Sequence, residues 1–273
     1  MTLTQDDFGY VRELVRRESA IVLDESKGYL IEARLSPVAR KAGLETISQL
    51  VEQIKRGSPT LKASVIEAMT TNETSFFRDV HPFEALATKV LPDLAEARQS
   101  ARKLRIWSAA ASTGQEAYTI AMVIRDRVPQ LDGWAVQIRG TDLSEAVLAQ
   151  AAEGRYAQLE VNRGLPATML TKHFERDGIA WRVKPELRRM VEFAQLNLIS
   201  PWPAMGRYDL VFLRNVLIYF DVDTKRDVLT KVRSTLAPDG YLFLGAAETT
   251  LQFDGLFERV PHARANCYRV SRA

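Results

Sequence analysis

The stretch Ile106–Tyr118 reads IWSAAASTGQEAY and decides the fold of the larger part of the chain. Ile106 and Trp107 belong to a predicted buried strand, the small residues after them predict a loop, and a helix is predicted to follow. Small side chains let a backbone approach a ligand closely, and a helix start offers unpaired N–H groups. At the first strand of an α/β domain this is where a nucleotide-like cofactor binds. A tight strand–helix turn without a ligand explains the same residues, and the loop lacks the G-x-G-x-x-G pattern of nicotinamide-binding sites.

The composition indicates a globular protein with a sizeable core. The chain has 273 residues, of which 46% are hydrophobic and 26% charged, so we expect one large domain and a smaller one. No apolar run reaches a membrane-spanning length, and residues 1–7 are not a signal peptide, so we expect a cytoplasmic protein without membrane insertion. The net charge of +3 and the pI near 9.0 permit an acidic partner without establishing one.

Predicted strands and helices alternate from Leu104 onwards. Strands are expected at 104–109, 136–141, 190–196 and 208–214, helices at 116–127, 144–152 and 224–236, and a closing hairpin pair at 241–245 and 264–270. This order predicts an α/β fold with a doubly wound, Rossmann-like sheet. Residues 156–189 fit the alternation poorly, so we interpret them as an inserted small β-subdomain.

The N-terminal part shows only helical patterns. Apolar residues recur at helical spacing through residues 1–70, with breaks at 24–26, 43 and 56–59. A helix from Pro82 to about Leu94 and a charged linker at 96–103 are expected before the first strand. We therefore place an all-helical domain at residues 1–75 and a second domain at 76–273, which begins with a linker helix within 76–103.

Polar side chains follow three of the other predicted strands. Asp142 can accept hydrogen bonds from both ribose hydroxyls of a nucleoside, although Asp142 or Ser144 can equally cap the next helix. Asn197 can meet an adenine edge or be a plain turn residue. Arg214 and Asn215 are costly to bury without partners, which favours a ligand site at this strand end over a capping role. Ligands bind at the carboxyl ends of strands in such sheets.

The segment 69–79 precedes the sheet and contains the candidate residues Asn72, Thr74 and Arg78. A loop with helix caps is the alternative explanation for its polar residues. The adjacent pair Phe76-Phe77 is more typical of a core than of a ligand site.

The sequence predicts no metal site. His81, His173 and His262 show no metal-ligand spacing, and we interpret them as surface or structural residues. The single cysteine, Cys267, excludes an internal disulfide and makes a thiolate cluster unexpected.

Taken together, these segments resemble the CheR family of chemoreceptor glutamate methyltransferases, which use S-adenosylmethionine. Residues 71–78, TNETSFFR, look like the family's T-N-x-T-x-F-F-R motif, and residues 108–116, SAAASTGQE, look like its cofactor loop. Asp142, Asn197-Leu198 and residues 214–220, RNVLIYF, match in order and context. The resemblance covers nearly the whole chain, including the helical domain and the inserted β-subdomain.

The resemblance implies an S-adenosylmethionine site that yields S-adenosylhomocysteine. The implied cofactor contacts are Asn72, Thr74 and Arg78 at the methionine end and reacting centre, Glu116 at the methionine portion, Asp142 at the ribose, Asn197 and Leu198 at the adenine side, and Arg214 and Asn215 near the methyl group. We expect Arg78 to orient the acceptor carboxylate and Tyr219 to add a hydrogen bond. Gln115 and Ala117 depart from the family's usual Glu and Pro, without removing a predicted contact if Glu116 is the functional carboxylate.

The resemblance also implies a docking surface for a partner. In the family a basic helix docks on acidic methylation-site helices of the cytoplasmic signalling region of chemoreceptors, and here the candidates are Lys27, Arg34, Arg40 and Lys41. A solvated helix face is the alternative explanation of this charge run. Ser36-Pro37 departs from the family pattern and is expected to break or kink the helix.

The inserted subdomain allows a finer expectation. Some family members grip a receptor C-terminal pentapeptide with a longer glycine-containing loop, whereas residues 174–181 are short and lack its second glycine. We therefore expect a pentapeptide-independent protein-glutamate O-methyltransferase. We expect a monomer, and the resemblance leaves room for a regulatory protein as a further partner.

Two rival functions stay open at this point. A nucleic-acid methyltransferase is suggested by the pI, but cytosine C5 chemistry needs a cysteine nucleophile and Cys267 lies near the C-terminus in a predicted strand. Amino-group methylation usually shows an Asn/Asp-Pro-Pro-aromatic tetrapeptide, which the sequence lacks, so we expect no nucleic-acid partner. A non-catalytic module that keeps the cofactor pocket as a sensor is the second rival, and nothing in the sequence favours loss of activity.

Overall fold

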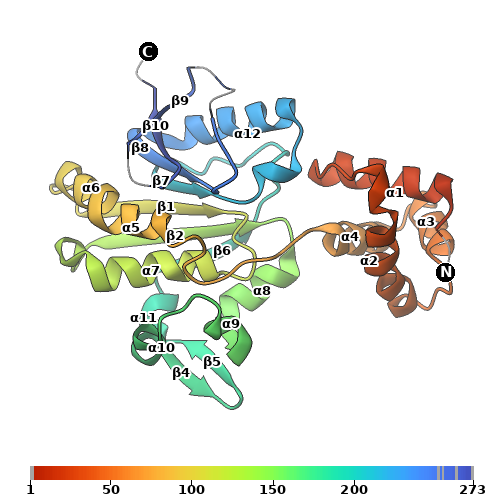
Figure 1. The fold of residues 1–273 in the computed structure, drawn as a ribbon, viewed down its shortest axis with the longest axis horizontal. Coiled ribbons are helices and arrows are strands. Elements are labelled where there is room, and N and C mark those ends of the chain that lie inside the picture. The colour runs from red at the N-terminus through yellow and green to blue at the C-terminus, as the bar shows by residue number, and fades with distance from the viewer. Residues whose placement is uncertain (1–2, 251–252, 254, 262–263, 272–273) are drawn as a thin grey trace. The chain divides into compact units, whose positions relative to one another are not determined.

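The computed structural model describes residues 3–250, 253, 255–261 and 264–271. Its contacts divide the chain into two units (Figure 1). The helical unit comprises Met1–Thr71 with Tyr219–Lys225, and the sheet unit comprises Asn72–Ile218 with Arg226–Ala273. Among the described residues no helix has the length and apolar character that a bilayer crossing requires.

Four helices build the helical unit, and their starts follow from capping residues. They are α1 (Gln5–Ser19), α2 (Gly28–Lys41), α3 (Ile47–Lys55) and α4 (Pro59–Met69), with a short 3-10 helix at Glu25–Lys27 before α2. The side chains of Thr4, Thr46 and Ser58 cap α1, α3 and α4 by accepting a backbone N–H. The apolar stripes that define the periodicity meet in a core of fully buried residues such as Val11 and Leu35.

Helix α2 corrects one expectation. It runs without interruption through Pro37, which therefore does not break it. The hydroxyl of Ser36 donates to the carbonyl oxygen of Glu32 at 2.7 Å, one turn earlier in the helix. Because Pro37 is exposed, the carbonyl group that loses its N–H partner there can be solvated, which limits the cost of the proline.

The sheet unit is a doubly wound α/β fold, as the alternation predicted. Its seven-stranded sheet has the order β6-β2-β1-β7-β8-β10-β9, in which β6, β2, β1, β7 and β8 are parallel. The strands are β1 (Lys103–Ala109), β2 (Ala135–Asp142), β6 (Val191–Gln195), β7 (Tyr208–Leu213), β8 (Leu236–Leu244), β9 (Phe257–Arg259) and β10 (Cys267–Val270). The helices α7 (Gln115–Arg127), α8 (Glu145–Glu153) and α12 (Val222–Thr235) follow β1, β2 and β7 in the chain (Figure 1).

The order of the strands reverses between β1 and β7, which creates a switch point in the sheet. The chain builds outwards from β1 through β2 to β6 and then returns to β7 on the other side of β1. The registers align Ala109 with both Thr141 and Leu213, and Leu213 with Leu244. The residues that follow these four strands therefore emerge together at one edge, where such folds bind ligands.

Two predicted segments at the flanks of the sheet differ from the structure. The expected helix from Pro82 to Leu94 is α5 (His81–Ala85), a π-helical turn (Leu86–Val90) and α6 (Leu91–Ala97). The expected hairpin partners β8 and β10 do pair antiparallel, but β9 lies between them in sequence and forms the sheet edge beyond β10. Sequence reasoning missed β9 because a three-residue strand carries almost no periodicity.

The expected charged linker at 96–103 is anchored through one arginine. Arg98 donates to Asp209 at 2.8 Å and to both carboxylate oxygens of Asp239 at 2.8 and 2.6 Å. These carboxylates raise the pKa of the guanidinium, and Arg98 in turn lowers the pKa of Asp239. A charged linker read from sequence alone thus serves to hold α6 against β7 and β8.

The inserted subdomain has its own small sheet. It contains β3 (Arg155–Ala157), α9 (Gln158–Asn162), α10 (Ala167–His173), β4 (Phe174–Asp177), β5 (Ala180–Val183) and α11 (Pro185–Arg188), and the strands pair antiparallel in the order β3-β5-β4. Tyr156 and Phe174 from this subdomain pack edge-on against Phe76, at 5.1 and 5.5 Å between ring centroids. Phe76 is fully buried, so the pair Phe76-Phe77 does belong to the core.

Two of the three histidines can be placed. His81 is partly exposed and lies 3.8 Å from Glu84, and the buried His173 contacts Asp126 at 2.9 Å. His262 lies outside the described residues. No cluster of metal-ligating side chains occurs among the residues that the structure describes.

Candidate active site

The loop after β1 follows the path that its small residues permit. Ala110 and Ser112 have positive φ values of 54° and 50°, and Gly114 has 92°. A Cβ atom on Gly114 would lie 2.9 Å from the Cβ of Ala151, so this turn requires glycine. The amide N of Ala111 donates to Thr141 O at 2.9 Å, which ties the loop to the end of β2. Gln115, one departure from the family pattern, is buried and accepts a hydrogen bond from the Thr113 hydroxyl.

Asp142 lies where a nucleoside is expected. Its carboxylate is only 8% exposed and accepts the backbone N–H groups of Ser112 at 2.8 Å and Ser144 at 3.1 Å. Burial raises the pKa of Asp142 despite these hydrogen bonds. The capping role that competed for Asp142 belongs to Ser144, whose hydroxyl accepts from Val147 N. A carboxylate has about four acceptor positions, and the backbone N–H groups of Ser112, Leu143 and Ser144 approach that of Asp142, so acceptor capacity remains for a ligand.

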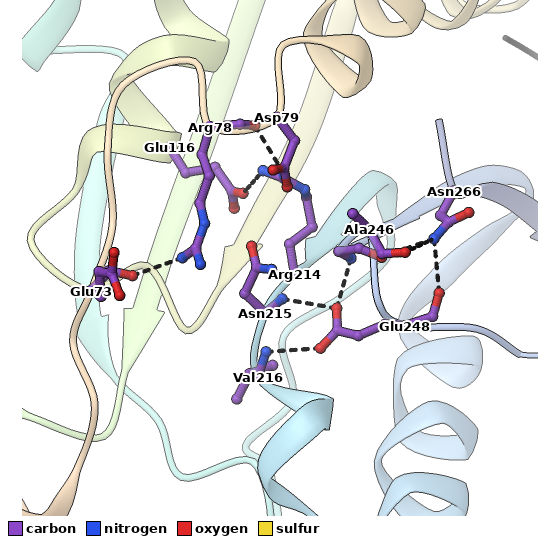
Figure 2. A network of polar contacts seen from close by, with 11 residues as sticks. Glu73, Arg78, Asp79, Glu116, Arg214, Asn215, Val216, Ala246, Glu248 and Asn266 are labelled. Atoms are coloured by element: carbon purple, nitrogen blue, oxygen red, sulfur yellow. Dashed lines mark hydrogen bonds and ion pairs between the residues drawn. The ribbon is translucent and has the colours of Figure 1, made fainter. Parts of the chain in front are cut away.

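A chain of charged side chains connects three segments of the site. The buried guanidinium of Arg214 donates to Glu116 at 2.9 Å, to Asp79 at 2.7 Å and to the carbonyl oxygen of Arg78 at 3.0 Å (Figure 2). Glu116 also accepts from the hydroxyl of Ser108 at 2.8 Å. Arg214 therefore neutralises two carboxylates and joins the end of β7, the start of α7 and the loop 72–80. These partners offset much of the cost of burying Arg214, which made this residue conspicuous in the sequence, although its Nε atom is buried without a hydrogen-bond partner.

The loop 72–80 is attached to the cofactor loop. Asn72 O accepts from the hydroxyl of Ser112 at 2.7 Å, and Phe77 N donates to Thr119 of α7 at 3.3 Å. Phe77 and Asp79 have positive φ values of 49° and 68°, a strained conformation that clusters at functional sites. Thr74 lies between these anchors and is partly buried.

Arg78 retains donors for a ligand. Its side chain donates to the carbonyl oxygen of Glu73 at 2.8 Å, as Figure 2 shows. A guanidinium carries five N–H donors, so one such bond leaves others available. Glu73 itself pairs with Arg163 of the inserted subdomain, and this pair lowers the pKa of the glutamate.

The segment after β6 approaches the same edge. The register pairs Asp142 with Gln195, which places Asn197 and Leu198 just beyond the strand end. Asn197 accepts from Ile199 N at 3.1 Å, while Leu198 is buried and its carbonyl oxygen accepts from Lys231 at 2.8 Å.

Sequence reasoning missed one buried carboxylate at this edge. Glu248 follows β8, is 5% exposed and accepts backbone N–H groups of Asn215 at 2.8 Å and Val216 at 2.9 Å. Asn215 has a φ of 58°, and the hydrogen bond from its backbone N–H group to Glu248 stabilises this conformation. A signal for Glu248 was present in the sequence, because this residue follows the predicted strand at 241–245 shortly after its end, as Asp142 follows the predicted strand at 136–141.

The structure does not bring every candidate into this site. Tyr219 groups with the helical unit, where its carbonyl oxygen accepts from Val22 N at 3.0 Å, and its role stays a prediction. Of the docking candidates, Lys27, Arg40 and Lys41 are exposed. Arg34 donates to Met69 O and Thr70 O at 2.9 Å each, which gives it a structural role at the end of α4 that we did not expect.

These residues fit S-adenosylmethionine. The buried Asp142 suits the donors of a ribose diol, and the close-approach loop offers no glycine-rich cradle for a diphosphate, which this cofactor lacks. The doubly wound sheet and the residues at this edge are those expected of an S-adenosylmethionine-dependent methyltransferase.

Comparisons with known proteins narrow this class. Residues 72–265 match the model "CheR methyltransferase, SAM binding domain", and residues 6–70 match "CheR methyltransferase, all-alpha domain". The protein belongs to the CheR methyltransferase family, and S-adenosylmethionine is its cofactor.

Curated relatives agree over the full length. The chain is 40% identical over 275 residues to "Chemotaxis protein methyltransferase 1" of Pseudomonas aeruginosa, covering 99% of this chain and 100% of that protein. It is 42% identical over 250 residues to "Chemotaxis protein methyltransferase Cher2" of Pseudomonas putida, covering 89% and 90%. Among solved structures, the "DhpI-SAH complex structure" covers 89% of this chain and 80% of that chain, with 17% identity and a TM-score of 0.34.

Proposed function

We propose that this protein methylates glutamate side chains in the cytoplasmic helical signalling region of chemoreceptors, which makes it a protein-glutamate O-methyltransferase. The observation that carries the proposal is the chemistry of the site. The segments 71–79, 108–118, 140–144, 195–198, 213–218 and 245–248 contain arginines and carboxylates but no histidine, lysine or cysteine. Such a site suits an acceptor that is already ionised at neutral pH and needs no general base, as a carboxylate is.

The chain's residues then have to orient and desolvate the acceptor. When bound, S-adenosylmethionine would supply an electrophilic methyl group for a carboxylate oxygen. The electron pair of the broken carbon–sulfur bond would stay on sulfur, and no proton would be released. Arg78 orients the incoming carboxylate with its free donors, while Arg214 is occupied by Glu116 and Asp79. Asp142 holds the ribose, Asn72, Thr74 and Glu116 surround the methionine end, and Asn197 and Leu198 flank the adenine. We keep Tyr219, which groups with the helical unit, as the candidate for an added hydrogen bond.

The names of the relatives support the partner. Both curated relatives are called chemotaxis protein methyltransferases, and the exposed cations Lys27, Arg40 and Lys41 suit an acidic receptor helix.

The experiment that tests the proposal is transfer of radiolabelled methyl from S-adenosylmethionine to membranes that contain chemoreceptors. We expect label in the receptor band that alkali releases as methanol, because carboxyl methyl esters hydrolyse in base. Alkali-stable label, or label in added nucleic acid, would contradict the proposal.

We further propose that receptor recognition needs no C-terminal pentapeptide. The strands β4 and β5 are joined by the two-residue turn Gly178-Ile179, so the subdomain has no long glycine-containing loop there. Calorimetry with a receptor C-terminal pentapeptide should show no binding. Micromolar binding would place the protein in the pentapeptide-dependent type.

A further inference from the structure

The carboxylate of Glu248 collects backbone N–H groups from two turns at the edge of the sheet. Its Oε2 atom accepts from Asn215 N at 2.8 Å and Gly245 N at 2.6 Å, and its Oε1 atom accepts from Val216 N at 2.9 Å and Ile218 N at 3.4 Å. Figure 2 shows the carboxylate beside the backbone of Asn215 and Val216. Two carboxylate oxygens have about four acceptor positions, so these N–H groups use its capacity fully.

No cation explains this buried charge. The side chain of Glu248 is 5% exposed, and the ion pairs described for the chain do not include it. A carboxylate is stabilised instead by converging backbone dipoles, as an anion is in a backbone nest. In this protein the anion is the carboxylate of Glu248, and it accepts the backbone N–H groups of the turn that contains Asn215.

The neighbouring residues are shaped to allow this contact. Asn215 has φ of 58°, a conformation that asparagine adopts more readily than most residues. A Cβ atom on Gly245 would lie 2.7 Å from Glu248 Oε2 and 2.8 Å from Asn215 Nδ2, so the turns approach this closely only with glycine.

A second side chain holds the turn that carries Glu248. The amide of Asn266, just before β10, donates to Gly245 O at 2.9 Å. It also donates to Glu248 O at 2.9 Å, as Figure 2 shows. The position of Glu248 is therefore set by β8 and β10, and the position of Asn215 is set by Glu248.

We propose that Glu248 is a positioning residue for the cofactor: it holds the turn 214–218 so that Asn215 meets S-adenosylmethionine. The inference rests on the proposed cofactor role of Asn215. Glu248 does not itself contact the cofactor and acts only through the backbone of the turn.

The substitution Glu248→Gln tests the idea at nearly constant volume. It replaces one acceptor oxygen by an NH₂ donor, which faces backbone donors and leaves N–H groups of the turn unpaired. Glu248→Asp keeps the charge but shortens the reach and serves as the conservative variant. Glu258→Gln is the matched control, because Glu258 is exposed on the edge strand β9.

The readouts are the dissociation constant of S-adenosylhomocysteine by calorimetry below the melting temperature and amide hydrogen exchange of residues 215–218. We expect Glu248→Gln to weaken binding roughly 10-fold and to lose protection in this turn, Glu248→Asp to recover part of both, and Glu258→Gln to match the unmodified protein. If Glu248→Gln does not fold, the same comparison is made with Glu248→Asp, for which weaker binding and reduced protection are expected.

Asn215→Ala separates the inference from the proposal beneath it. If Asn215→Ala binds S-adenosylhomocysteine as tightly as the unmodified protein does, the cofactor role of Asn215 is overturned, and the inference with it. If Asn215→Ala binds S-adenosylhomocysteine more weakly but the Glu248 variants bind it as tightly as the unmodified protein, only the positioning role of Glu248 is overturned. A lower melting temperature with unchanged affinity and protection would show that Glu248 is only structural.

Discussion

We predict that Arg78 contributes to turnover much more than to cofactor binding. Its side chain donates to Glu73 O and retains other donors, so we expect it to orient the acceptor rather than to hold the cofactor strongly. Arg78→Ala should lower kcat for receptor methylation by roughly 100-fold, since misplacing a reacting group has an effect of that order. Binding of S-adenosylhomocysteine, measured by calorimetry, should change much less. Unchanged methylation kinetics would refute this role.

The titration of Asp142 should make the affinity for the cofactor depend on pH. Burial raises its pKa above that of an unfolded aspartate, so its contribution to the stability of the unliganded protein is present at low pH and is lost as pH rises through the raised pKa. Ribose hydroxyls donate to the ionised form, so the affinity for S-adenosylhomocysteine should fall as pH drops through that pKa. Calorimetric titrations from neutral to acidic pH measure this fall.

Asp142→Asn provides the control for this pH dependence. The amide does not titrate and accepts with only one oxygen, so binding at neutral pH should be roughly 10- to 100-fold weaker and the profile flat in this range. A profile with the same slope in Asp142→Asn would assign the titration to another group.

The residues that sequence reasoning missed share one property. Asp79 and Glu248 were recognisable as acidic, but their meaning depends on partners far along the chain: Asp79 pairs with Arg214, 135 positions away, and Glu248 accepts from Asn215, 33 positions away. A single sequence shows the residue type and leaves the partner undetermined. Asp142 was predictable because a loop and a strand that precede it already point to a nucleoside.

At the scale of elements, two arginines of α2 have the same charge but different surroundings. Arg34 hydrogen-bonds the last carbonyls of α4, whereas Arg40 is exposed in the last turn of α2. Arg34→Glu should lower the free energy of unfolding by about 1–3 kcal/mol, because the partly buried carbonyl groups of Met69 and Thr70 lose their donor. Arg40→Glu should change it by less than about 1 kcal/mol.

The same pair of variants tests receptor docking. Arg40→Glu should weaken receptor methylation while the affinity for S-adenosylhomocysteine, measured by calorimetry, stays unchanged. Thermal unfolding of Arg34→Glu checks its structural role. Equal methylation by Arg40→Glu and the unmodified protein would remove this surface from the docking model.

Local signals predicted the elements well where they were long and periodic. The strands β1, β2, β6 and β7 and the helices α7, α8 and α12 begin and end within a few residues of the predicted ones, because alternation and small-residue loops are local properties. The strand β8 begins at Leu236, five residues before its predicted start at 241. The π-helical turn at Leu86–Val90, the short strand β9 and the continuity of α2 through Pro37 depend on tertiary packing, which overrides local preference.

At the scale of the whole molecule, the cofactor should stabilise the sheet unit, since all the candidate cofactor contacts belong to it. S-adenosylhomocysteine at 100 times its dissociation constant should add about 2.7 kcal/mol and raise the melting temperature by about 5–11 °C. Differential scanning calorimetry measures this shift. The same concentration should stabilise Asp142→Asn less, and an equal shift in both proteins would argue against the ribose contact.

The sequence by itself determined the class of fold, the small-residue stretch at 106–118 and the family of the chain, because periodicity, small residues and motif spacing are properties of the chain alone. Only the tertiary structure decided which groups meet at the site. Strand register places Ala109, Thr141, Leu213 and Leu244 level, and this alignment brings Arg214 to Glu116 and Glu248 to Asn215. The physical reason is that buried charges must find partners, and which partner lies within reach is set by the packed sheet rather than by neighbours in sequence.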